Sequence, residues 1–236
     1  MKAGVGPVFP DPLRSVADLD KLNVNVDVSE TLNYVFKALT LTRHRLEGKV
    51  PLIGFSGAPW TLMAYMIEGG GSKTLSKAKK WLYTEPDASH RLLKLLTRVI
   101  SAYMIEQVQW PSSSNEWSTL KLYFSFSYFS LNIQVAAGAQ LLQVFESSAE
   151  YLGPELFEQF SLPYLEDIAT AVRQGIAERG LPDVPMIVFA KGAYHSLSKL
   201  SYTGYNVVGL DWTVDPHIAR DYVHIAVQGT WYSNSI

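Results

Sequence analysis

Charged side chains follow the candidate strands of this chain, where α/β proteins place their reactive groups. Glu146 and Asp211 each end an apolar segment, and Lys191 ends a third. Two carboxylates on one rim of a barrel are the arrangement of a glycosidase, and a desolvated lysine can form a Schiff base. The alternative, which the isolated pattern favours, is that each carboxylate caps a helix or pairs with a lysine. On that interpretation Lys191 neutralises a nearby carboxylate.

The histidines do not form a metal-binding pattern. The chain has five of them: His44, His90, His195, His217 and His224. No pair combines metal-ligand spacing with a carboxylate on a shared face. His44 and His90 lie in polar helical contexts, which predicts surface positions. His195 lies near the end of a candidate strand and could reach a site there.

A glycine-rich run at residues 69–74 invites comparison with a phosphate-binding loop. That motif needs a glycine immediately before its lysine and a strand before the loop. Here Ser72 precedes Lys73, and a predicted helix precedes the run. The run is therefore interpreted as a loop that caps a helix.

The segment from Pro51 to Tyr65 indicates how a site could be built. An apolar run ends at Phe55, small residues follow around Gly57, and helix-forming residues resume. A strand that ends in small residues leaves room above it, and the carboxyl end of a parallel strand is where α/β proteins place ligands. Phe55 and Phe145 occupy matching positions on two candidate strands. They could be core residues, or they could wall a pocket for a flat ring.

Strands and helices alternate along the chain. Strands are predicted at residues 52–55, 139–146, 185–191, 206–212 and 225–229. Helices are predicted at residues 29–47, 59–67, from about 86 to 104, 154–160, 163–178, 196–201 and 218–222. Ser29 is the expected N-cap of the first helix, glycines at 69–71 end the second, and Gly180 is the expected C-cap after residue 178.

Continuous apolar strands that alternate with helices predict a parallel sheet buried on both faces. The polar or small residues at the strand ends favour a (β/α)8 TIM-type barrel with its site on that rim. A full barrel has eight strands in about 250 residues, whereas about five strands can be counted here. We therefore expect an incomplete barrel of about five parallel strands in a single domain, residues 1–236.

Composition narrows the possible functions. The 236 residues are 47% hydrophobic and 18% charged, with a net charge of −2 and no cysteine. Disulfides, thiolate metal sites and cysteine nucleophiles are excluded. No basic patch indicates nucleic acid, and no apolar run is long enough for a membrane span. Since the first residues also lack a signal-peptide pattern, we expect a cytoplasmic protein.

Several motifs closely resemble the uroporphyrinogen decarboxylase family and appear in the family's order. They are Phe9-Pro10-Asp11-Pro12-Leu13, Gly54-Phe55-Ser56-Gly57-Ala58-Pro59-Trp60-Thr61-Leu62-Met63, Tyr65-Met66, Glu68-Gly69-Gly70-Gly71-Ser72, Ala78-Lys79-Lys80-Trp81-Leu82-Tyr83, Gly138-Ala139-Gln140, Phe145-Glu146-Ser147, Phe189-Ala190-Lys191 and Val208-Gly209-Leu210-Asp211-Trp212. The resemblance covers most of the chain outside residues 109–134, which are interpreted as an insertion.

The resemblance implies a TIM barrel that works as a homodimer without a metal or organic cofactor. The family is a carboxy-lyase of haem and porphyrin biosynthesis, which decarboxylates the four acetate side chains of uroporphyrinogen III to give coproporphyrinogen III. The implied substrate-binding residues are Tyr65 and Ser147 through their hydroxyls, Phe55 and Phe145 as apolar walls, and the backbone of Gly57.

Parts of the family's site have no counterpart in this chain. These are an arginine-rich N-terminal segment, the aspartate that centres on the pyrrole nitrogens, and a C-terminal histidine motif. The sequence therefore predicts a homologue that is incomplete at both ends, assigns no catalytic residue, and leads us to expect poor solubility and little activity. Two alternatives are a catalytically dead fragment that pairs with an intact subunit, and a corrinoid-type methyltransferase of the same superfamily. The lack of cysteine argues against the methyltransferase, since such enzymes hold zinc with cysteine and histidine.

Overall fold

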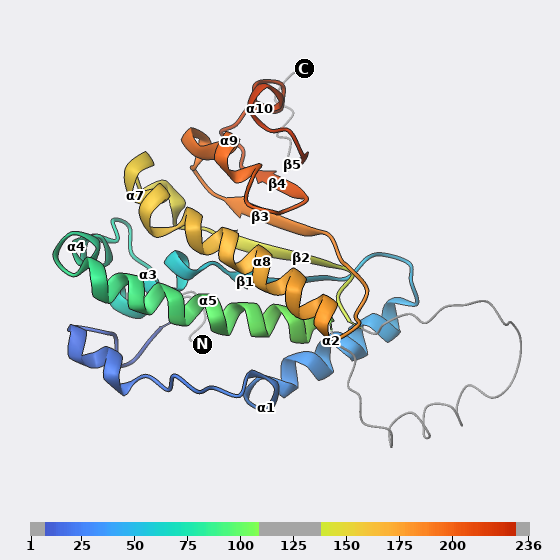
Figure 1. Ribbon diagram of the computed structural model, residues 1–236, viewed down its shortest axis with the longest axis horizontal. Helices are drawn as coiled ribbons and strands as arrows, with labels where there is room; N and C mark the ends of the chain where they lie inside the picture. Colours follow the sequence, from blue (N-terminus) through green and yellow to red (C-terminus); the bar gives the residue numbers. More distant parts are fainter. Residues whose placement is uncertain (1–7, 109–137, 230–236) are drawn as a thin grey trace, which may run out of the picture.

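Five parallel strands form one open sheet in the order of the chain. The computed structural model describes residues 8–108 and 138–229 (Figure 1), so the insertion expected at 109–134 lies outside the described residues. The strands are β1 (Ile53–Gly57), β2 (Leu141–Glu146), β3 (Met186–Ala190), β4 (Val207–Leu210) and β5 (Ala226–Gly229). Each pairs with the next in sequence, and β1 and β5 form the edges. Parallel strands paired in chain order with helices between them are the topology of a TIM-type barrel, which confirms the predicted incomplete barrel.

Helices precede β1 and occupy the connections between strands. The helical elements are η1 (Val16–Lys21), α1 (Val28–Thr31), α2 (Asn33–Leu46), α3 (Pro59–Glu68), α4 (Ser76–Thr84), α5 (Pro86–Val108), η2 (Ala149–Tyr151), α7 (Pro154–Phe160), α8 (Leu162–Glu178), η3 (Tyr194–Ser196), α9 (Leu197–Leu200) and α10 (Pro216–Tyr222). In the part of the chain that the structure describes, none of these helices has the length and apolar character needed to cross a membrane.

One face of the sheet is covered by α3, α5 and α8. Figure 1 shows the long helices α5 and α8 running side by side across the sheet, and the two pack directly on each other. The helix predicted from about residue 86 to 104 is confirmed as α5, and its apolar residues Leu92, Ile100 and Met104 are buried at helical spacing. On α8 the buried residues recur with helical spacing, for example Leu165 and Ile168. This amphipathic pairing forms the core. Within residues 8–108 and 138–229, no helix covers the other face of the sheet, which is called the open face below and on which Phe55 is exposed.

Helix ends follow the predicted glycines. Gly69 has φ 85° and donates its N–H to the carbonyl of Tyr65 at 2.9 Å, so it ends α3 in the left-handed conformation. Gly180 has φ 64°, and the following residue, Leu181, donates to the carbonyl of Ile176 at 3.0 Å. These bonds satisfy carbonyl groups that a helix end leaves unpaired.

The first predicted helix is wrong at its start. Asp27, rather than Ser29, is the N-cap: its Oδ1 accepts a hydrogen bond from the N–H of Glu30 at 3.0 Å. A non-helical backbone at Leu32 then separates α1 from α2. The helix α4 was not predicted, although the buried Ala78, Trp81 and Leu82 carry a helical period.

Candidate functional site

Tyr65 and Ser147 line the same pocket at the carboxyl edge of the sheet. Tyr65 lies on α3, which follows β1, and Ser147 lies in the turn that follows β2. The pocket has a volume of about 150 Å³ and is also bounded by Ser72 and Glu150. Two hydroxyl groups from different elements therefore converge on one small concavity, and both can donate hydrogen bonds to an anionic group there.

A row of phenylalanines crosses the open face beside this pocket. Phe145 and Phe189 are register partners on β2 and β3, with ring centroids 5.8 Å apart. The Phe55 ring lies edge-on to Phe145 at 6.0 Å, with planes 86° apart. At the next position along the row, a Cβ on Gly209 would lie 3.1 Å from Phe189 Cβ, so the glycine leaves room for that ring. The expectation that Phe55 and Phe145 occupy matching strand positions is wrong, because Phe55 pairs with Gln143 and Gly57 pairs with Phe145. Sequence reasoning also missed Phe189, which the strand register places beside Phe145.

Gly57 joins the end of β1 to the start of α3. A Cβ at this position would lie 3.0 Å from Leu62 Cδ2, so the end of that side chain would have to shift to admit a larger residue. The next residue, Ala58, donates its N–H to the carbonyl of Phe145 at 2.8 Å, which ties the turn to β2. This hydrogen bond holds the start of α3, the helix that carries Tyr65, close to the strand ends.

Glu146 points away from the open face and into the helices. Its side chain has no exposed surface. It accepts hydrogen bonds from the hydroxyl groups of Thr61 and, at 3.1 Å, Ser161. Burial raises the pKa of Glu146 to about 7, and the hydrogen bonds from Thr61 and Ser161 limit that rise by favouring the charged form.

Asp211 has the opposite environment. Its Oδ2 accepts from the N–H of Gly192 at 2.6 Å, and its Oδ1 accepts from the N–H of Thr213 at 2.8 Å. Burial raises its pKa, but the hydrogen bonds from Thr213 and Gly192 outweigh burial, so the pKa lies below its usual value. β3 lies between β2 and β4, so Glu146 and Asp211 do not end neighbouring strands. Because Glu146 is also buried against Thr61 and Ser161, the two carboxylates do not form the glycosidase-like pair that the sequence left open.

Lys191 neutralises a carboxylate, as the sequence favoured. Its Nζ lies 2.7 Å from Glu150 Oε1 and 5.4 Å from the centre of the Trp212 ring. Glu150 is also part of the wall of the Tyr65 pocket. The lysine therefore places positive charge beside the pocket while keeping its own counterion.

The histidines lie apart from this pocket. His44 is exposed, as predicted. The surface prediction for His90 is wrong: its half-buried ring stacks on Phe160 at 4.6 Å, and its Nδ1 lies 2.5 Å from Tyr164 Oη. His195 lines a different pocket, after β3. Among the described residues, no group of three or more histidine or acidic side chains could hold a metal ion.

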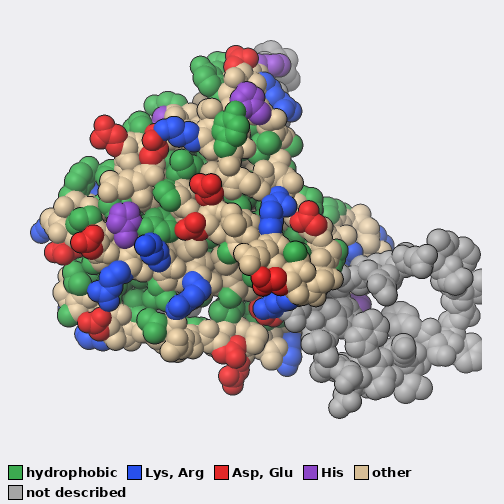
Figure 2. All heavy atoms as spheres, viewed as in Figure 1, with side chains coloured by type: hydrophobic (Ala, Val, Ile, Leu, Met, Phe, Trp, Pro, Cys, Tyr) green, Lys and Arg blue, Asp and Glu red, His purple; other side chains and the backbone are tan. Residues whose placement is uncertain are grey.

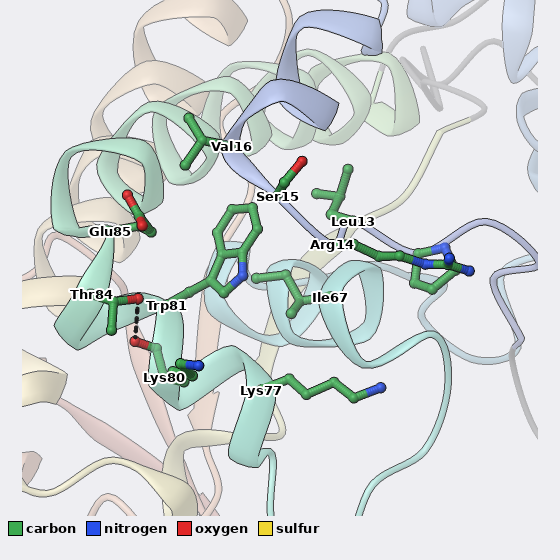
Figure 3. Close-up of a pocket in the computed structure, with 11 residues that line it drawn as sticks. Leu13, Arg14, Ser15, Val16, Ile67, Lys77, Lys80, Trp81, Thr84 and Glu85 are labelled. Atoms are coloured by element: carbon green, nitrogen blue, oxygen red, sulfur yellow. Dashed lines mark hydrogen bonds between the residues drawn. The ribbon is translucent and has the colours of Figure 1, made fainter.

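A larger concavity lies on another part of the surface. It measures about 660 Å³ and is bounded by the segment before η1, by α3 and by α4. Figure 3 shows the Trp81 indole at its centre beside Ile67, with Arg14, Lys77 and Lys80 around it. None of its lining residues lies in the turn directly after a strand. Figure 2 shows acidic and basic side chains interspersed over the face in view, without a region of one sign.

The structure defines an α/β protein with a pocket at the carboxyl edge of a parallel sheet, where proteins of this class place their ligands. A family model described as "Uroporphyrinogen decarboxylase (URO-D)" matches residues 1–112 and 119–233. The chain therefore belongs to the uroporphyrinogen decarboxylase family. Only residues 113–118 fall between the two matched ranges, so the family model matches most of the segment 109–134 that was expected to be an unmatched insertion.

Curated relatives carry the same family name. The chain is 55% identical over 220 residues to "Uroporphyrinogen decarboxylase" of Danio rerio, covering 93% of this chain and 52% of the relative. For the protein of that name from Homo sapiens, the identity is 49% over 223 residues, with 94% and 53% covered. For that of Salinibacter ruber it is 48% over 223 residues, with 94% and 54% covered. The chain thus spans about half the length of the curated relatives it matches.

Proposed function

We propose that this chain forms part of the substrate site of a uroporphyrinogen decarboxylase, a carboxy-lyase of haem and porphyrin biosynthesis. The observation that carries the proposal is the shared pocket of Tyr65 and Ser147 beside the phenylalanine row. Uroporphyrinogen combines pyrrole rings with many carboxylates. Hydroxyl donors suit the carboxylates, and the phenylalanine rings suit the apolar faces of the pyrroles.

In the proposed reaction, the substrate's own pyrrole ring accepts the electrons, and the protein binds and orients the substrate. Protonation of a pyrrole carbon makes the ring an electron sink. The bond between the acetate methylene and its carboxylate then breaks, its electron pair enters the ring, and carbon dioxide leaves. A proton is then added to the methylene to give a methyl group, and the ring carbon loses the proton that it had gained, which restores the pyrrole. In this proposal Tyr65 and Ser147 hold carboxylates, and Phe55 and Phe145 orient the ring. The protein lowers the activation free energy most where its groups match the charge that develops in the transition state.

The isolated chain is proposed to turn over uroporphyrinogen slowly at best. A substrate with many carboxylates needs cationic partners, and Arg residues are the strongest of these. Beside the Tyr65 pocket, the charge of Lys191 is already compensated by Glu150. Turnover by the purified 236-residue chain at the rate of a full-length relative would contradict this part of the proposal.

We also propose that the protein lies in the cytoplasm and that it forms a homodimer. The absence of cysteine fits a reducing compartment. Exposed apolar side chains support a contact with a second copy: Tyr194, Ile218 and Tyr222 line a pocket of about 460 Å³ in the segments that follow β3 and β4. Sedimentation should show a dimer that Ile218→Asp converts to monomer. A monomer at all concentrations would refute the dimer.

The substrate site can be tested with uroporphyrin, the fluorescent oxidised form of the substrate. Saturable quenching of its fluorescence is expected with the wild-type chain. Tyr65→Phe and Ser147→Ala should each weaken binding by about tenfold, because each removes a hydrogen bond to a charged group. Tyr83→Phe is the matched control, since Tyr83 is 70% exposed on α4 and does not line the pocket. Equal affinities in all four proteins would refute the assignment.

A further inference from the structure

The fully buried Glu146 adjoins Ser147 in the chain but has no access to the pocket. We propose that Glu146 is a positioning residue, which acts through Thr61 to set where the Ser147 turn and Tyr65 lie relative to each other. This inference deepens the proposed function and rests on it for the identity of the ligand. Glu146 and Thr61 do not line the pocket themselves, whereas Ser148, on which they act, does.

The first step is a relay through one hydroxyl group. Thr61 Oγ1 donates a hydrogen bond to Glu146 Oε1. The same oxygen accepts a hydrogen bond from the N–H of Ser148 at 3.2 Å. A hydroxyl group can donate only once, so the carboxylate fixes its proton and turns its lone pairs toward Ser148. Glu146 thereby orients the acceptor that holds the backbone next to Ser147.

The second step is a hydrogen bond to the carbonyl group of Ser148, which together with the bond to its N–H forms a clamp on this residue. Trp60 Nε1 donates to the carbonyl of Ser148 at 3.0 Å. Two consecutive residues of α3 therefore hold the N–H and the carbonyl of Ser148. Trp60 has no exposed surface, and Thr61 and Ser148 are both buried. Since buried polar groups lose much stability when a partner is removed, this clamp fixes the turn firmly to α3.

The third step links the clamp to Tyr65. Tyr65 follows Thr61 by four residues in α3. Side chains separated by four residues lie on the same face of a helix, one turn apart. Any shift of α3 against the turn after β2 would therefore change the separation of the Tyr65 and Ser147 hydroxyls. From the face of the sheet that the helices cover, Glu146 thus sets the separation of the Tyr65 and Ser147 hydroxyl groups.

The choice of an acid at this position supports a geometric role. Burying a carboxyl group costs free energy, and an apolar residue of similar size would fill the space without that cost. Hydrogen bonds from Thr61 and Ser161 to the two carboxyl oxygens of Glu146 offset part of that free energy. Ser161 precedes α8 and makes no link to Ser148. The Thr61 hydroxyl therefore links Glu146 to Ser148, whereas the Ser161 hydroxyl binds Glu146 without that link.

Four variants separate positioning from simple stabilisation. Thr61→Val keeps the shape but removes the relay. Thr61→Ser restores the hydroxyl. Ser161→Ala removes the other hydrogen bond to Glu146 and leaves the relay intact. Glu146→Gln keeps one acceptor oxygen. Thermal melting of each variant comes first, because loss of either hydroxyl is expected to lower the melting temperature.

Two readouts then decide. The first is the ¹H–¹⁵N signal of the Trp60 indole, assigned with Trp60→Phe, which reports the bond to Ser148 without any ligand. The second is the affinity for uroporphyrin. Thr61→Val should shift the indole signal and weaken binding by about tenfold. In Thr61→Ser and Glu146→Gln, the indole signal and the affinity for uroporphyrin should both be close to those of the wild type. Ser161→Ala should leave the indole signal in place and change the affinity by no more than about twofold, although its melting temperature is lower.

The outcomes are distinguishable. An unchanged indole signal in Thr61→Val would overturn the relay, as would equal shifts in Thr61→Val and Ser161→Ala. If the wild-type chain does not bind uroporphyrin, the proposed function fails, and the indole signals still decide whether Glu146 positions the turn. If Thr61→Val loses its fold, Glu146→Ala takes its place, because it removes both acceptor oxygens. The relay predicts a shifted indole signal in Glu146→Ala and none in Ser161→Ala, and an equal or larger shift in Ser161→Ala would contradict the proposal.

Discussion

The two faces of the sheet have contrasting surroundings. On the face beneath α3, α5 and α8, the residues Leu142, Val144, Glu146, Val188 and Val208 have no exposed surface. On the opposite face, Phe55 is 61% exposed and Ile53 is 38% exposed. Both faces belong to the same strands, because successive side chains of a strand point to opposite sides.

This contrast separates stability from ligand contact within one strand. On β2, Val144 and Glu146 face the helices, while Phe145 between them faces the open side. Packing beneath the helices stabilises the fold, whereas the open side presents the phenylalanine rings. Substitutions on the two faces should therefore have different effects, although the residues are neighbours in sequence.

The largest expected effect is on the covered face. Leu142→Ala should lower the free energy of unfolding by about 3 kcal/mol, because it leaves a cavity under the helices. Ile53→Ala on the open face is the control and should cost less than about 1 kcal/mol, since its side chain is already partly in water. Urea unfolding measures both. Similar losses for the two variants would remove the proposed distinction between the faces.

The pH dependence of stability should reveal the buried acid. The pKa of Glu146 is about 7 in the folded chain, above its ordinary value of 4.5. Between these values the folded state keeps a proton that the unfolded state loses, so stability falls as the pH rises. Relative to Glu146→Gln, the wild-type chain should lose about 3 kcal/mol from below pH 4.5 to above pH 7. Urea titrations at several pH values measure the difference.

Asp211 provides an internal comparison for that experiment. Its pKa is lowered, so its contribution to stability is present above the unfolded value of 3.8 and is lost as the pH falls through the folded value. The two acids therefore act in opposite directions and in different pH ranges. A wild-type profile parallel to that of Glu146→Gln between pH 5 and 7 would show that Glu146 is not a protonated buried acid.

The smallest effect on stability is expected at the phenylalanine row. Phe55→Ala should change the free energy of unfolding by no more than about 0.5 kcal/mol, because most of the ring is exposed. The same variant should weaken uroporphyrin binding severalfold through loss of ring contact. A large loss of stability without a change in affinity would make Phe55 a core residue rather than a pocket wall.

Much of the fold follows from periodicity. The apolar runs located all five strands, and the stripe on α5 located the longest helix. The same runs predicted a sheet buried on both faces, but within the described residues helices cover one. An apolar run cannot tell whether its second face meets helices, a ligand or further chain.

The site was only partly predictable, because register and side-chain direction are tertiary properties. Glu146 and Ser147 are adjacent in sequence, yet one enters the core and the other lines the pocket. Nothing local distinguishes a rim carboxylate from a buried one when the exact end of a strand is unknown. Phe189 joined the row only through its pairing with Phe145. Tyr65 and Ser147 were predicted from family resemblance, not from spacing.

The most direct test is hydrogen exchange of the chain with and without uroporphyrin, read by mass spectrometry. Our account predicts added protection at residues 55–72 and 145–152, which carry the phenylalanine row and the Tyr65 pocket. Residues 12–16 and 77–85, around the larger concavity of Figure 3, should not change. Protection at the larger concavity, with none at the strand ends, would contradict the assignment of the site.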